Sequence, residues 1–178
     1  MDPFVTLGLP RRYQLDSQQL ETNYRELQRV LHPDRHGSAA ASQRRMNLLK
    51  AVEVNEAYRT LKNEVARAEA LLSLYAAGAP SEAKQEDPEF LMEVLELREA
   101  LSEAHAAGDV AAVRAMADRA QRAKLAIAGQ LSSTFETLSQ GVSTAALTTA
   151  RKLLGRLKYF HRFLDEVSAF EQRTEEQG

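Results

Sequence analysis

Apolar residues recur at helical spacing along almost the whole chain, and this pattern constrains the fold more than any other feature. Between residues 109 and 139 they fall at intervals of three and four, in a coiled-coil-like seam that Lys124 interrupts. Such spacing places side chains on one face of an α-helix. Aromatic residues make up only 6 % of the chain and tryptophan is absent, which favours helix over sheet. The sequence therefore predicts an all-α fold.

Breaks in the pattern divide the chain into two helical modules. Gly78 and Pro80 interrupt it within 76–87, which is the best candidate for a linker. The expected helices before this linker are 17–31, 42–61 and 64–75. Those after it are 88–105, 109–139 and 143–170, and their short connections favour an antiparallel three-helix bundle. We therefore expect an N-terminal module over 1–75, a linker over 76–87, a bundle over 88–172 and a polar tail over 173–178.

In the helix expected over 42–61, four residues are predicted to share one side: Leu48, Val52, Asn55 and Tyr58.

Charge and composition exclude several classes of protein. The formal net charge of −2 argues for neither nucleic acid nor membrane as a partner. The absence of cysteine removes disulfides, thiolate chemistry and cysteine-based metal ligation. No basic leader precedes an apolar run, and no apolar stretch approaches the roughly 18 residues of a membrane-spanning helix. We expect a soluble, cytoplasmic protein without a cofactor.

The stretch VLHPDRHG, residues 30–37, lies between two expected helices. His32, Asp34 and His36 suggest either an acid–base pair or a metal site. A base and its orienting carboxylate need separate rigid supports, which residues two apart around a proline rarely have. The metal ligands would be few and mobile, and no nucleophile elbow, phosphate loop or HExxH motif accompanies them. We therefore predict no catalytic or metal site, and interpret the loop with Arg25 and Arg29 as a protein contact. A purely structural role for Asp34, as the cap of a turn, stays open.

The expected helix over 88–105 has too many apolar residues for one face. Phe90, Val94, Leu97 and Leu101 form a core stripe. The remaining apolar residues lie on another side, interleaved with acids: Leu91, Met92, Leu95, Glu96, Glu99 and Glu103. They are either a flank of the core or a site for a partner with apolar and basic residues. On the last helix Tyr159 and Phe163 lie off the main stripe, and additional core is the simpler interpretation there.

Several stretches of this sequence resemble those of two known protein families. HPD at 32–34 between two helices, with Tyr24, Asn55 and Tyr58 around it, resembles a J domain. The stretches MDPFVTLGLPRRYQLD, RAEALLSL (67–74) and DPEFLMEVLELREAL (87–101) are similar to the HscB-type co-chaperone of iron–sulfur cluster assembly, in its bacterial form. The resemblance implies two partners, a dedicated DnaK-type chaperone (HscA-like) and the iron–sulfur scaffold protein (IscU-like), and no enzymatic activity of its own.

The resemblance also implies site residues. Those facing the chaperone are His32, Pro33, Asp34, Arg25, Arg29 and Arg35. Those facing the scaffold are Leu91, Met92, Leu95, Glu96, Glu99, Glu103 and an aromatic of the last helix, Tyr159 or Phe160. Ala100 stands where the family often has a second acid. The main alternative is a J-domain protein whose bundle binds a different folded client or mediates dimerisation.

Overall fold

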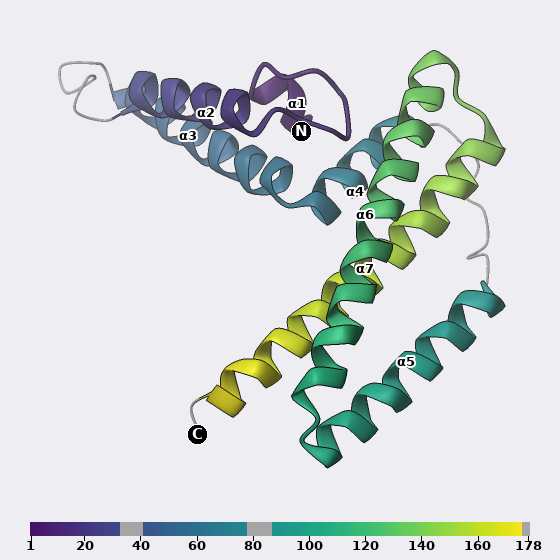
Figure 1. Ribbon diagram of the computed structural model, residues 1–178. Coiled ribbons are helices and arrows are strands. Elements are labelled where there is room, and N and C mark those ends of the chain that lie inside the picture. The colour runs from purple at the N-terminus through teal and green to yellow at the C-terminus, as the bar shows by residue number, and fades with distance from the viewer. Residues whose placement is uncertain (33–40, 78–86, 176–178) are drawn as a thin grey trace.

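The computed structural model of the chain describes residues 1–32, 41–77 and 87–175, and within these ranges it is built of helices joined by turns, with no strand (Figure 1). The prediction of an all-α fold is confirmed. The helices are α1 (Pro3–Thr6), α2 (Ser17–Leu31), α3 (Ala41–Lys62), α4 (Glu64–Tyr75), α5 (Pro88–Ala107), α6 (Val110–Gln140) and α7 (Thr144–Glu175). None of the helices in these ranges is long and apolar enough to cross a membrane.

Helices α2 and α3 form an antiparallel hairpin, as predicted. Asp16 caps α2 by accepting hydrogen bonds from the backbone N–H groups of the first turn. The rings of Tyr24 and Tyr58 stack across the hairpin with centroids 3.9 Å apart. The Tyr24 hydroxyl donates to Asn55 Oδ1 at 3.0 Å. These contacts fix α2 against α3, and α2 ends at Leu31, where the backbone of His32 becomes extended.

The buried side of α3 differs from the sequence expectation. Leu48 and Val52 are exposed, whereas Asn47, Val54, Ala57 and Leu61 are buried. The side of α3 that was predicted to carry Leu48, Val52, Asn55 and Tyr58 is therefore not the buried side at Leu48 and Val52. Two of the four buried positions hold a polar or a small residue, Asn47 and Ala57, and these give little hydrophobic signal.

Helices α5, α6 and α7 form the predicted antiparallel three-helix bundle. Gly108 ends α5 in the left-handed region at φ 66°, and Asp109 caps α6 directly afterwards. The seam of α6 is buried at positions spaced as the sequence predicts, namely Val113, Ala120, Ile127, Leu131 and Leu138. The α6 seam packs mainly along α7.

Helix α4 joins the hairpin to the bundle by packing against α6 and α7. The ring of Phe135 on α6 lies 6.0 Å from that of Tyr13 and 6.2 Å from that of Tyr75. Lys124, the lysine that interrupts the α6 seam, makes a 2.6 Å ion pair with Glu64 at the start of α4. The hairpin and α5 consequently lie on opposite sides of α6 and α7 (Figure 1).

Burial at this junction perturbs two polar side chains. Arg67 Nη1 donates to the Leu61 carbonyl at 2.7 Å, and its guanidinium lies 5.2 Å from the centre of the Tyr13 ring. Desolvation lowers the pKa of Arg67 and raises the pKa of Tyr13 to about 12. The two side chains stabilise the junction by packing and by the placement of the guanidinium over the ring.

Candidate protein-binding surfaces

The start of α5 is tied firmly to α7. Asp87 caps the helix, accepting weakly from the Phe90 N–H at 3.4 Å, and accepts two hydrogen bonds from Arg156 on α7, at 2.9 and 2.7 Å. The hydrogen bonds from Arg156 hold the pKa of Asp87 below its usual range. Leu97 and Leu101 are buried against the bundle. These contacts fix which side of α5 turns inward.

The other side of α5 carries large apolar side chains that are exposed. Leu91 is 60 % exposed, Met92 59 % and Leu95 48 %. Three acids, Glu96, Glu99 and Glu103, are exposed among and after them. We call these six residues the α5 surface. Their apolar side chains do not fill the bundle core, so the interpretation of these residues as a flank of that core does not hold.

Of the three aromatics considered on α7, only Tyr159 is partly exposed. Phe160 is buried, and so is Phe163, for which the interpretation as additional core is correct. The Tyr159 ring meets Phe90 edge-on at 5.5 Å, and its hydroxyl donates a long hydrogen bond of 3.4 Å to the Val94 carbonyl. Burial raises the pKa of Tyr159. Tyr159 therefore lies against α5, beside the residue that precedes Leu91.

A groove of about 400 Å³ separates α5 from α7 next to Tyr159. It is lined by Arg98 of α5 and, on α7, by Gly155, Lys158, Tyr159, Arg162, Phe163 and Glu166. The sequence interpretation passed over Arg98 and Arg162, which it counted only toward net charge. For Arg98 the spacing was the available signal, because it follows Leu91 and Leu95 at i+7 and i+3 and all three lie on one row of the helix. No such local signal was available for Arg162.

At the end of α2, the structure brings together part of the predicted chaperone-binding set. His32, Arg25 and Arg29 are exposed. Arg25 Nε pairs with Glu21 at 2.9 Å on the same helix, and an exposed pair of this kind contributes little to stability. Pro33, Asp34, Arg35 and His36 lie outside the described residues.

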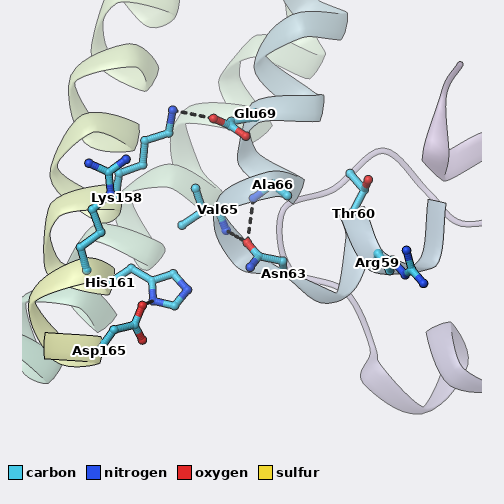
Figure 2. A pocket seen from close by; sticks show the side chains of 10 residues that line it. Arg59, Thr60, Asn63, Val65, Ala66, Glu69, Lys158, His161 and Asp165 are labelled. Carbon is cyan, nitrogen blue, oxygen red and sulfur yellow. Dashed lines mark hydrogen bonds and ion pairs between the residues drawn. The ribbon is translucent and has the colours of Figure 1, made fainter. Parts of the chain in front are cut away.

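A second groove, of about 540 Å³, lies where the hairpin module meets α7 (Figure 2). Lys158 Nζ crosses it to pair with Glu69 of α4 at 2.5 Å, and His161 pairs with Asp165 at 3.5 Å. Asn63 caps α4 at its edge, accepting from the N–H groups of Val65 and Ala66. The groove thus contains one of the contacts that attach α4 to the bundle, the Lys158–Glu69 pair.

In the described part of the chain, no group of three or more histidine, aspartate or glutamate side chains is placed to hold a metal ion. The His161–Asp165 pair in the second groove supplies only two ligands.

Comparison with known proteins identifies both modules. The DnaJ domain family matches residues 2–70, and the family described as HSCB C-terminal oligomerisation domain matches residues 86–168. The Co-chaperone protein HscB homolog of Photobacterium profundum is 37 % identical over 170 residues, covering 94 % of this chain and 98 % of the relative. The chain belongs to the HscB co-chaperone family. It is accordingly a J-domain co-chaperone, of the family that serves iron–sulfur cluster assembly.

Solved structures of HscB proteins show the same fold. Chaperone HscB from Vibrio cholerae superposes with a TM-score of 0.78 at 33 % identity, over 97 % of this chain and 99 % of that one. Human co-chaperone protein HscB superposes with a TM-score of 0.80 at 23 % identity, over 96 % and 82 % of the two chains. The attachment of the J domain to the bundle through α4 is thus part of a fold that spans nearly the whole chain.

Proposed function

We propose that this HscB-family protein binds an iron–sulfur scaffold protein on the α5 surface and presents it to a dedicated DnaK-type chaperone, whose ATPase it stimulates. The observation that carries the proposal is the exposure of Leu91, Met92 and Leu95 on a helix whose other large apolar residues face the core. An exposed apolar row flanked by acids favours a partner with complementary apolar and basic residues.

The chaperone contact is proposed at the end of α2 and in the residues that follow it in the sequence. It comprises His32, Pro33, Asp34 and Arg35, with Arg25 and Arg29 on the preceding helix. Guanidinium groups attract the acidic surface of a partner and act mainly on the association rate, so binding weakens as salt is added. The protein supplies no catalytic group. It binds one conformer of the ATPase better than the other and so shifts the population toward the hydrolysing state.

Single-turnover ATP hydrolysis by the cognate HscA-like chaperone tests the J-domain half of the proposal. We expect the protein to raise the hydrolysis rate, and to raise it further when the scaffold protein is present. His32→Gln removes the stimulation without unfolding the chain, because His32 is exposed. Full stimulation by this variant, or none by the unaltered protein, contradicts the proposal.

A second candidate function for the bundle is self-association, because the family that matches residues 86–168 is described as an oligomerisation domain. Sedimentation equilibrium of the protein alone and with the scaffold distinguishes the two. A 1:1 complex of monomers supports scaffold binding at the α5 surface. A stable dimer that Leu91→Ala and Leu95→Ala dissociate assigns that surface to a second copy of the chain.

A further inference from the structure

The groove between α5 and α7 is continuous with the α5 surface. Leu91, Leu95 and Arg98 follow one another along a single row of α5, at intervals of four and three. Arg98 is also part of the groove wall. A partner that covers the two leucines therefore reaches Arg98 within one further turn of the helix.

The groove carries positive charge. Three of its lining residues are cations, Arg98, Lys158 and Arg162, and Glu166 is the one acid among the described residues that line it. Lys158 is paired with Glu69, which leaves the guanidinium groups of Arg98 and Arg162 as the main source of positive potential. Across the row of leucines the opposite edge of α5 carries Glu96, Glu99 and Glu103. The exposed side of the bundle thus has an acidic edge, an apolar middle and a basic groove.

Gly155 makes the groove open on the α7 side. It stands four residues before Tyr159 and seven before Arg162, so the three share one row of α7. A β-carbon at Gly155 would meet no atom within 4 Å, and its φ is not in the left-handed region. Neither backbone conformation nor internal packing therefore requires glycine there, although glycine weakens a helix interior. The space above Gly155 is available to something outside this chain.

We infer that the α5–α7 groove receives an acidic segment of the scaffold protein, with carboxylates against Arg98 and Arg162 and the chain of the segment over Gly155. This inference rests on the proposed function and specifies the chemistry of that partner: basic and apolar where it meets the α5 surface, acidic where it enters the groove. Two surfaces of opposite charge on either side of an apolar row also fix the orientation of the bound partner, because a reversed partner would place like charges together.

Calorimetric titration of the full-length protein with the purified scaffold protein tests the inference on two independent variants. Arg162→Glu reverses one charge in the groove, and Gly155→Leu fills the open space. Each is expected to weaken binding by about tenfold or more. Gly155→Leu should at the same time raise the melting temperature, because leucine is the better helix former and its β-carbon meets no atom within 4 Å.

Gly129→Leu is the matched control for the steric variant. Gly129 also lies in the interior of a long helix, α6, and its added β-carbon also meets nothing within 4 Å. It should raise the melting temperature in the same way and leave the affinity unchanged. Affinity within about twofold of the unaltered protein for either Arg162→Glu or Gly155→Leu overturns the inference. If Leu91→Ala with Leu95→Ala still weakens binding roughly 30-fold, the proposed function survives that result. If the unaltered protein does not bind the scaffold, both the inference and the proposed function fail.

Discussion

The α5 surface allows a quantitative prediction for the variant Leu91→Ala/Leu95→Ala. Complete burial of a leucine side chain contributes about 1.5–3 kcal/mol. Leu91 is 60 % exposed and Leu95 48 % exposed in the free protein. About half of that energy therefore remains available to a partner at each position, which gives about 1 kcal/mol per residue and about 2 kcal/mol for the pair. We expect the dissociation constant for the scaffold protein to rise roughly 30-fold.

Isothermal titration calorimetry measures this change directly, and the fold is checked by the thermal unfolding curve. The melting temperature should fall by only a few degrees, because each of the two side chains is about half exposed in the free protein. The control is Leu125→Ala on α6, which removes a side chain of the same kind that is 61 % exposed but lies outside the α5 surface. Equal affinities for the double variant and the control would show that the scaffold binds elsewhere.

Three further predictions concern stability. Phe135→Ala should destabilise the protein by about 3–5 kcal/mol, because it removes the buried ring on which two tyrosines pack; a loss below about 1 kcal/mol in urea unfolding would show that the junction contributes little. Because Arg156 holds the pKa of Asp87 below its usual range, the contribution of this pair is complete above about pH 4 and is lost as the pH falls through the lowered pKa. Asp87→Asn should therefore be less stable than the unaltered protein at pH 7 and equally stable in acid, as followed by urea unfolding across pH. Lys124→Ala should cost about 1–3 kcal/mol, because Lys124 is largely buried, whereas Lys158→Ala, whose pair is about half exposed, should cost less than about 1 kcal/mol in the same assay.

The helices and their order could be predicted from the sequence because their signals are local. The apolar residues of the α6 seam recur from Val113 to Leu138. Caps such as Asp16 and Asp87 mark the start of a helix within one turn. The α5 surface was predictable for the same reason. Its residues lie on the same helix as the core stripe, so their angle to that stripe follows from residue number alone.

Features that depend on distant residues could not be predicted. Lys124 interrupts its seam, and the reason is Glu64, which lies in the other module. The buried side of α3 could not be identified from its sequence, because Asn47 and Ala57 are buried while the larger apolar residue Leu48 is exposed. The basic groove needs residues from both α5 and α7, and no local pattern brings Arg98 and Arg162 together.

The contacts of α4 with the bundle have a consequence for an adaptor that serves two partners. The ring of Phe135, the Glu64–Lys124 pair and the Glu69–Lys158 pair attach the J domain directly to α6 and α7. The distance between the two proposed binding sites is then fixed by folded helices. With a flexible linker between the modules, that distance would fluctuate as in a random coil. Under the proposed function, a partner held on α5 would meet the second partner at one effective concentration and in one orientation. Loosening α4 would thus lower the efficiency of a ternary complex while leaving each binary affinity intact.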